Sequence, residues 1–200
     1  MHLFSKNFIS FRLWVYLLFC AVLKFAVVKS LWHAESNLLS WSQPKEGIML
    51  KVYLSGEIHT DWREQIIGGA KGLDVEFFSP VTNHAASDDC GVNILGKEPN
   101  KYWHDHKGAM VNAIRTRKGI VDADVVVVRF GEKYRQWNAA FDAGFAAALG
   151  KSLIVLQQPD HDHALKEVDA AALAMAREPS EVVEILRYVL TGDLPIKSSI

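Results

Sequence analysis

The chain has 200 residues, half of them apolar, and a formal net charge of -1. This composition allows one ordinary core, and the near-neutral charge excludes a global basic field for nucleic acid as well as an acidic disordered chain. The two cysteines, Cys20 and Cys90, lie in very different contexts, so neither a disulfide framework nor a zinc spacing is expected.

The first 47 residues are predicted to lie outside the main domain. Residues 1–34 contain four lysines and arginines but no acid, and Leu13 to Leu23 is apolar throughout. The segment suits a signal sequence, an organelle-targeting segment or a membrane anchor, although Lys24 makes a stable span costly. The alternative is a dispensable extension, joined to the domain by a polar linker. A membrane is expected as a partner only through this segment. The sequence does not decide the cellular compartment, because the segment suits an organelle as well as a membrane.

The predicted domain spans residues 48–192, with a short tail over residues 193–200. It begins with an apolar strand from Met49 to Leu54. Asp61 suits the cap of the helix that follows, and Val75 to Phe78 is a second strand. Strand, helix and strand in so few residues predict a compact βαβ unit.

Residues 79–100 have no clear period. A loop of this length inside a compact domain is usually a lid or a substrate wall, or else disordered, and a short helix is expected around Val92 to Leu95. Tyr102 to Val121 then repeats apolar residues at helical spacing. The other face of this predicted helix is polar and includes Asn112 and Arg115.

The stretch from Asp124 to Leu156 predicts a second βαβ unit. Val125 to Val128 is an unbroken β-branched run, typical of a strand that is buried on both faces. Asn138 suits the cap of a helix over Ala139 to Leu149, and Gly150 suits its left-handed C-terminal cap. A further strand, Leu153 to Leu156, follows at once, and the crossover should be right-handed.

The last elements complete an α/β pattern. A short helix or turn is expected over Ala164 to Val168, an edge strand over Ala171 to Ala176, and a final helix over Glu181 to Leu190. Five strands alternating with helices predict a three-layer flavodoxin/Rossmann-like sandwich with a parallel sheet in the order 2-1-3-4-5. Its ligand-binding switch point is then between the first and third strands, beside Gly56 and Gly131.

Asp142 is the only acid on the alanine-rich helix. We expect it in or near the first turn, where the helix dipole favours an ionised carboxylate, with Asn138 on the same face. That face opens toward the carboxyl edge of the sheet, where open α/β folds bind ligands. Close packing of the helix against the sheet is sufficient to explain its small residues.

Several segments carry a resemblance in the same order along the chain: KVYLSGEIHTDWREQI, PNKYWHD, NAIRT and FGEKYRQWNAAFDAGFAAALGKSLIVL. Together they closely resemble the YtoQ family, which looks like a branch of the nucleoside 2-deoxyribosyltransferase superfamily. The resemblance covers about Met49 to Leu190 and does not touch the first fifty residues.

The resemblance implies roles for individual residues. The superfamily's Tyr-x-x-Gly is matched by Tyr53 and Gly56, and the aspartate that opens its third strand is matched by Asp124. Its nucleophilic carboxylate, in an acid-x-Gly context, falls on Asp142. Two departures are visible. The nucleophile of the transferases is a glutamate, which is one methylene longer than Asp142. The transferases also carry an aspartate about two turns before the nucleophile, where this chain has Gln136, Trp137 and Asn138.

The implied reaction is displacement at an N-glycosidic carbon. Asp142 would attack the sugar and form a glycosyl-enzyme ester, while a nearby acid protonates the departing base. Glu57 and Asp124 are the candidate acids, with Glu57 better placed just past the first strand, and Tyr53 could hold the nucleophile in line. The candidates for substrate binding are Gly56, His59, Asn112, Arg115, Gly131, Trp137 and Asn138.

The expected partner is a small nucleoside or nucleotide, since Arg115 could receive a phosphate. Structural alternatives stand beside these roles: Asp124 could cap a strand or bind Arg115, Glu57 could be a solvated turn acid, and Trp137 could belong to the core. A binding module that holds a nucleotide without turnover is the alternative function.

No cofactor, metal or nucleic acid is expected as a ligand. His104 and His106 are two residues apart, so they do not share a helix face and make a poor chelate. The chain has neither a phosphate-cradling glycine loop nor a serine nucleophile elbow. A homo-oligomer is expected only by analogy with relatives of the fold.

Overall fold

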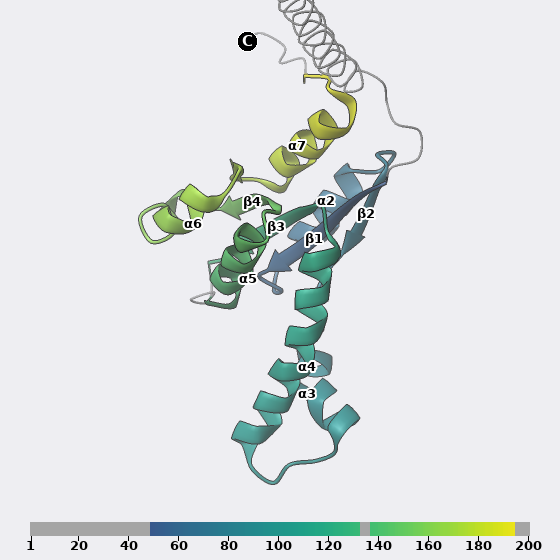
Figure 1. The fold of residues 1–200 in the computed structure, drawn as a ribbon, viewed down its shortest axis with the longest axis vertical. Coiled ribbons are helices and arrows are strands. Elements are labelled where there is room, and N and C mark those ends of the chain that lie inside the picture. The colour runs from purple at the N-terminus through teal and green to yellow at the C-terminus, as the bar shows by residue number, and fades with distance from the viewer. Residues whose placement is uncertain (1–48, 133–136, 195–200) are drawn as a thin grey trace, which may run out of the picture. The chain divides into compact units, whose positions relative to one another are not determined.

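A five-stranded parallel sheet organises the described part of the chain, residues 49–132 and 137–194, in this computed structural model (Figure 1). The spatial order is β2-β1-β3-β4-β5, which confirms the predicted class and strand order. The strands are β1 (Leu50–Gly56), β2 (Val75–Phe78), β3 (Val125–Phe130), β4 (Ser152–Gln157) and β5 (Ala174–Ala176).

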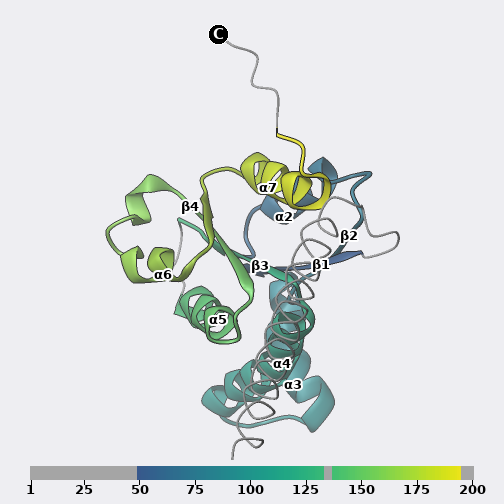
Figure 2. The ribbon, with the colours of Figure 1, turned by 45° about the horizontal axis from the view of Figure 1, so that its top comes forward.

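Helices cover both faces of the sheet, giving three layers. They are α2 (Trp62–Gly69), α3 (His84–Leu95), α4 (Lys101–Asp122), α5 (Trp137–Ala148), α6 (Lys166–Ala171) and α7 (Pro179–Thr191). Figure 2 shows α2 and α7 on one side of the sheet, with α4 and α5 on the other. The alternation of side chains along each strand divides the core accordingly: Val52 and Leu54 face α2 and α7, whereas Tyr53 faces α4 and α5.

Helix α5 begins two residues earlier than predicted, at Trp137 and not at Ala139. Because it starts at Trp137, Asn138 lies inside the first turn and does not cap it, so that prediction is wrong. Asp142 accordingly lies in the second turn, where the helix dipole contributes little. Ala139, Ala143 and Ala146 are buried against the sheet. Gly150 has φ +67°, the left-handed conformation expected after the helix.

The long loop predicted over residues 79–100 is wrong, because most of it is helix α3, of which the short helix expected around Val92 to Leu95 is only the last turn. The Oδ1 atom of Asn83 accepts a hydrogen bond from the Ala86 N–H at 2.9 Å and caps this helix. Helix α3 packs on α4 through glycines: a Cβ added at Gly91 would lie 2.3 Å from the Gly108 nitrogen. Contact between two backbones leaves no apolar period in the sequence, so periodicity could not reveal the helix. The pair α3 and α4 projects away from the sheet (Figure 1).

The remaining elements differ from prediction mainly at their ends. Helix α6 extends to Ala171, so that β5 is shorter than the strand predicted over Ala171 to Ala176. Asp61 precedes α2 but makes no side-chain cap bond; its Oδ1 instead accepts from the Gln65 amide at 2.9 Å. Gly192 ends α7 with φ +74°.

The described residues contain no helix that has both the length and the apolar character needed to cross a membrane. The targeting segment and linker predicted for residues 1–47 lie outside the described residues, as do residues 195–200 of the predicted tail. The domain limits 48–192 stay a prediction. Cys90 carries a free thiol, as expected.

Candidate functional site

A hydrogen bond between two distant segments forms the centre of the site. The Ser55 hydroxyl, near the carboxyl end of β1, donates to Oδ2 of Asp142 on α5 at 2.5 Å. Ser55 is buried, whereas Asp142 is partly exposed. The contact joins residues that are 87 positions apart, so it depends on the tertiary fold. The bond places a carboxylate beside β1, next to the switch point between β1 and β3 at which the strand order reverses. Open α/β folds bind their ligands at this point.

Burial and hydrogen bonding act in opposite directions on this carboxylate. Burial raises the pKa of Asp142 above its ordinary value, because desolvation disfavours the charged form. The hydrogen bond from Ser55 lowers the pKa again by stabilising the ionised carboxylate. The pKa of Asp142 thus depends on two opposing effects, and the side chain is partly exposed. A carboxylate with a perturbed pKa in such a position is a candidate for a functional site.

Tyr53 lies on the same side of the sheet as Ser55, because side chains two residues apart in a strand share a face. Its ring packs on α4 at Gly119, where an added Cβ would lie 2.4 Å from the Tyr53 ring. Among the described residues no group completes a hydrogen bond to the buried Tyr53 hydroxyl. Burial raises the pKa of Tyr53, the nearby Thr116 hydroxyl opposes this, and the charge of Asp142 adds to the increase. The phenol therefore stays protonated and available as a donor.

Glu57 uses its carboxylate within its own loop. It is buried, and it accepts hydrogen bonds from the Thr60 hydroxyl at 2.6 Å and from the backbone N–H of His59. Gly131 packs against it, since a Cβ there would lie 2.2 Å from Cγ of Glu57. The interpretation of Glu57 as a solvated turn acid is therefore wrong. In this geometry Glu57 shapes the loop after β1, and Gly131 makes room for its side chain.

Arg63 is a site residue that the sequence did not reveal. Its guanidinium is buried and donates to the carbonyls of Leu54 at 3.1 Å, Gly56 at 3.1 Å and Glu57 at 2.5 Å. Burial lowers the pKa of Arg63 to about 10, and Glu57 opposes the shift. Its position beside Trp62 on a short helix carries no sequence signal, because a buried arginine is rare and its acceptors are backbone atoms.

Asp124 lies at the opposite end of the sheet from Ser55. Its Oδ2 accepts from the Lys51 backbone N–H at 2.9 Å, and its own N–H donates to the Lys51 carbonyl at 2.8 Å. Ser55 follows Lys51 by four residues, so the two positions are about 13 Å apart along the strand. This geometry favours the strand-end alternative, and we leave Asp124 out of the site that we propose.

The remaining candidates divide between the site and other surfaces. Arg115 is exposed on α4, and its positive charge is one of those that lower the pKa of Tyr53. Asn112 instead joins α4 to α3, donating to the carbonyl and the hydroxyl of Ser87, both at 3.0 Å. Trp137 and Asn138 are exposed at the start of α5, and at 71% exposure Trp137 is not a core residue.

His59 is exposed in the loop after β1, next to the Glu57 carboxylate that its backbone contacts. On the α3–α4 side, His104 contacts Asp89 at 3.2 Å and Asp105 at 3.3 Å. In the part of the chain that the structure describes, no three His, Cys, Asp or Glu side chains gather in a way that could hold a metal ion.

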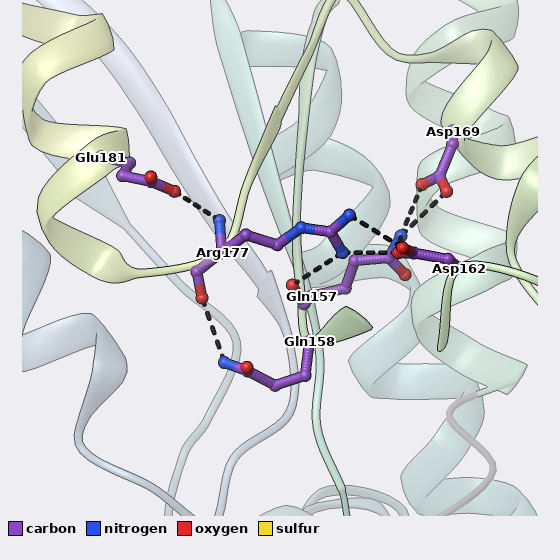
Figure 3. A network of polar contacts seen from close by, with 6 residues as sticks. All are labelled: Gln157, Gln158, Asp162, Asp169, Arg177 and Glu181. Carbon is purple, nitrogen blue, oxygen red and sulfur yellow. Dashed lines mark hydrogen bonds and ion pairs between the residues drawn. The ribbon is translucent and has the colours of Figure 1, made fainter. Parts of the chain in front are cut away.

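A second polar network follows β4 and β5 (Figure 3). The Gln157 amide donates to the two Asp169 oxygens at 3.0 and 2.8 Å, and the Arg177 guanidinium pairs with Asp162 at 2.5 and 3.0 Å. The Gln158 amide donates to the Arg177 carbonyl at 3.1 Å. These bonds tie the loop after β4 to the start of α7, so the network stabilises that end of the sheet.

The strand order and the polar side chains gathered beside β1 define the class of doubly wound α/β proteins that bind small ligands at a switch point. The family described as Nucleoside 2-deoxyribosyltransferase YtoQ matches residues 53–190. The chain belongs to this family, and thus to a nucleoside-modifying enzyme family. The predicted resemblance is confirmed.

Known proteins share this similarity to different degrees. Uncharacterized protein YtoQ of Bacillus subtilis (strain 168) is 40% identical over 140 residues, covering 69% of this chain and 95% of that protein. A crystal structure of a conserved protein from Enterococcus faecalis V583 shares the fold, with a TM-score of 0.50 and 13% identity over 72% of this chain and 100% of its own. The 2-deoxyribosyltransferase of Bacillus psychrosaccharolyticus has a TM-score of 0.45 and 16% identity, over 66% and 90% of the two chains.

Proposed function

We propose that this protein cleaves the N-glycosidic bond of a nucleoside or nucleotide, as a deoxyribosyltransferase or an N-glycosidase, with Asp142 as nucleophile. The observation that carries the proposal is the Asp142 carboxylate, which accepts a 2.5 Å hydrogen bond from Ser55 beside the buried Tyr53 phenol. Membership of the YtoQ family supports the substrate class.

The reaction proceeds in two displacements. An Asp142 oxygen forms a bond to the anomeric carbon while the bond from that carbon to the base nitrogen breaks, and the base leaves with the electron pair and takes up a proton. Water, or a second base, then attacks the same carbon and releases the carboxylate. Water as acceptor gives hydrolysis, and a base as acceptor gives transfer.

Ser55 and Tyr53 prepare the nucleophile for this chemistry. The Ser55 hydroxyl orients one carboxylate oxygen and favours ionisation, which leaves the other oxygen of Asp142 for the sugar. Because its pKa is raised, Tyr53 acts as a hydrogen-bond donor to the carboxylate or the sugar and not as the acid.

Two other groups extend the proposed site. Glu57 remains the candidate acid for the departing base, and that role requires its carboxylate to leave the Thr60 hydroxyl. Arg115 is the candidate group for a phosphate, and the exposed Trp137 ring is a surface on which a base can stack. Gly56, His59 and Asn138 line the approach in this proposal. No cofactor takes part.

The decisive test is base release from a panel of nucleosides and nucleotides by Asp142→Asn. We expect no release above background, because the amide is not a nucleophile, together with an unchanged far-UV circular dichroism spectrum. Asp124→Asn is the matched control and should retain activity. Mass spectrometry of the wild type should find a glycosyl adduct on the Asp142 peptide. Full activity in Asp142→Asn would remove this residue from the mechanism.

Binding without turnover is the second candidate function. The engagement of the Glu57 carboxylate by its own loop favours it, because no free acid is then available for the base. Calorimetric binding of a nucleotide by wild-type protein, with no base released over hours, would establish this alternative. Glu57→Gln separates the two functions, since it should slow turnover while leaving calorimetric binding intact.

A further inference from the structure

One cation near the carboxyl end of β3 has no partner in the part of the chain that the structure describes. The Arg129 side chain is half-buried, and its Nε atom is enclosed without a hydrogen-bond acceptor. None of the ion pairs between described residues includes Arg129. A buried donor without an acceptor costs free energy, so the stability of the fold does not explain this side chain.

The other described arginines that are withdrawn from solvent have acceptors within the chain. Arg63 donates to three carbonyl oxygens, and Arg177 pairs with an aspartate at 2.5 and 3.0 Å. Arg187 contacts an acid one turn earlier on α7 at 3.5 Å. Arg129 therefore differs from them in that its burial is not matched by an acceptor.

The Arg129 side chain leaves the sheet on the face that α2 and α7 cover (Figure 2). It shares this face with Val127, which belongs to the same core cluster as Trp62 of α2. Its partner in the register of β1 is Gly56, so no side chain of β1 covers the guanidinium at that position. Arg63 donates from α2 to the Gly56 carbonyl at 3.1 Å, so two arginines adjoin this glycine. A ligand can thus approach Arg129 along the bare backbone at the end of β1.

Arg129 lies close to the residues of the candidate site. Ser55 on β1 pairs in register with Val128, the residue before Arg129 on β3. The Cα atoms of Ser55 and Arg129 are therefore about 6 Å apart. Their side chains leave opposite faces of the sheet, that of Ser55 toward Asp142 on α5. A ligand that lies across the carboxyl edge between β1 and β3 contacts Asp142 with one part and Arg129 with another.

The chemistry of this cation suits a phosphate. A planar guanidinium donates two parallel hydrogen bonds to phosphate oxygens, and it keeps its charge at every physiological pH. The Glu57 carboxylate, just past β1, is engaged by the Thr60 hydroxyl and by the backbone of its own loop, so it does not pair with Arg129. We propose that Arg129 binds the phosphate group of a nucleoside monophosphate whose sugar lies at Asp142.

This contact makes the protein selective for nucleotides over nucleosides. The inference rests on the proposed function for the place of the sugar. Arg129 contributes more to the affinity than Arg115, because a phosphate satisfies its buried donor, whereas the exposed Arg115 is already hydrated. A nucleoside leaves Arg129 without an acceptor, so it should bind more weakly than its monophosphate.

Isothermal titration calorimetry with AMP, CMP, GMP and UMP, each beside its nucleoside, tests the assignment. We expect the best monophosphate to bind the wild type at least about tenfold more tightly than its nucleoside. Arg129→Gln should remove this difference and leave the nucleoside affinity within about twofold of the wild type. Arg115→Gln should have a smaller effect. Arg187→Gln is the matched control, because it removes the same charge from the second half of α7.

Base release, measured by chromatography in the same samples, separates this inference from the proposed function. Nucleotide binding that depends on Arg129, without base release, overturns the proposed function and leaves the phosphate contact in place. The inference is overturned if no monophosphate binds more tightly than its nucleoside. It is also overturned if Arg115→Gln abolishes the preference for the monophosphate while Arg129→Gln retains it.

Thermal unfolding distinguishes phosphate binding from a structural role. Without ligand, Arg129→Met should have a Tm no lower than that of the wild type, because no hydrogen bond of Nε is lost. The best monophosphate should raise the Tm of the wild type but not that of this variant. Arg129→Lys keeps the charge without the planar guanidinium and should show intermediate affinity. A lower Tm in Arg129→Met, with unchanged nucleotide affinity in both variants, would assign Arg129 to packing and overturn the proposal.

Discussion

Two regions along the carboxyl edge of the parallel sheet carry polar side chains and satisfy them differently. After β4 and β5, Arg177 pairs with Asp162 and Gln157 donates to Asp169, so charges and amides find partners within the chain (Figure 3). Beside β1, the partly buried Asp142 has its pKa raised by burial, and the Tyr53 hydroxyl is buried with no completed hydrogen bond among the described residues.

The difference separates stabilisation from function. A carboxylate that is paired with arginine is neutralised and gains from being folded, whereas a carboxylate that is desolvated beside a phenol costs folding free energy. A carboxylate that carries such a cost and lies in a partly open position is a candidate for a functional site. This difference supports the proposal that the β1 region carries the reaction, whereas the β4–β5 region holds the loops in place.

The largest expected effect is that of Asp142→Asn, which should reduce base release at least about a thousandfold. Its effect on stability has the opposite sign. The folded pKa of Asp142 is raised above its unfolded value, so its contribution to stability is fully present below about pH 4 and is lost as pH rises through the folded pKa. At pH 7 the neutral amide removes this cost, so Tm should rise. Differential scanning calorimetry at pH 7 and at pH 4 measures the change, and a lower Tm at pH 7 contradicts the comparison.

Gly56→Ala should be the most destabilising of these substitutions. Gly56 has φ +101°, and an added Cβ would lie 2.1 Å from the Arg129 carbonyl oxygen, so β1 must separate from β3. We expect a loss of more than about 1 kcal/mol in the free energy of unfolding. Gly68→Ala is the control: no heavy atom lies within 4 Å of its Cβ, and it should stabilise α2 by roughly 0.5–1 kcal/mol. Denaturant titration distinguishes them, and equal effects would count against this account of β1.

Ser55→Ala should reduce kcat/KM about ten- to a hundredfold and should move its acid limb to higher pH. The hydroxyl lowers the pKa of Asp142, so removing it raises the pKa at which the nucleophile ionises. Ser152→Ala, at the exposed start of β4, should leave the pH profile unchanged. A slower Ser55→Ala enzyme with an unshifted acid limb would assign Ser55 to packing only.

Arg177→Met should lower Tm and leave base release within about twofold of the wild type. The guanidinium pairs with Asp162, and this pairing raises the pKa of Arg177, so the substitution removes a stabilising interaction from the loop after β4. Thermal unfolding and the nucleoside assay measure the two effects. A large loss of turnover at unchanged Tm would mean that the β4–β5 region takes part in the reaction.

Asp124→Asn should have the smallest effect on activity. Its carboxylate joins the starts of β1 and β3, far from Ser55, so we expect a slight decrease in Tm and base release within about threefold of the wild type. Steady-state kinetics on the best substrate of the panel is the measurement. A loss as large as that of Asp142→Asn would restore Asp124 as a catalytic residue.

The strand order could be predicted because its evidence is local. The β-branched run at Val125 to Val128 and the alternation of strands with helices indicate a parallel sheet, and burial on both faces confirms this interpretation. Only the last turn of helix α3 was predicted, because the helix packs through Gly91 and Gly108, a contact that needs small residues and no apolar stripe. The start of α5 was misplaced by two residues, which also removed the dipole argument for Asp142.

The site could be predicted only in part. The position of Asp142 on a helix that faces the sheet follows from periodicity, but its bond to Ser55 depends on the registration of α5 against β1. A signal for Ser55 was nevertheless available, since it is a polar residue two positions after Tyr53 and thus on the same strand face. Arg63 left no such signal, because its acceptors are carbonyl oxygens that every sequence provides.

The hydrogen bonds of the Arg63 guanidinium have a consequence for ligand binding. By holding the carbonyls of Leu54, Gly56 and Glu57 at once, it fixes the turn after β1 before any nucleoside arrives. In the proposed reaction, a ligand that docks on a turn already ordered loses less conformational entropy, so the free energy of its contacts would remain available to distort the sugar toward the oxocarbenium ion. The order of this turn thus comes from the hydrogen bonds of one buried cation to backbone carbonyls.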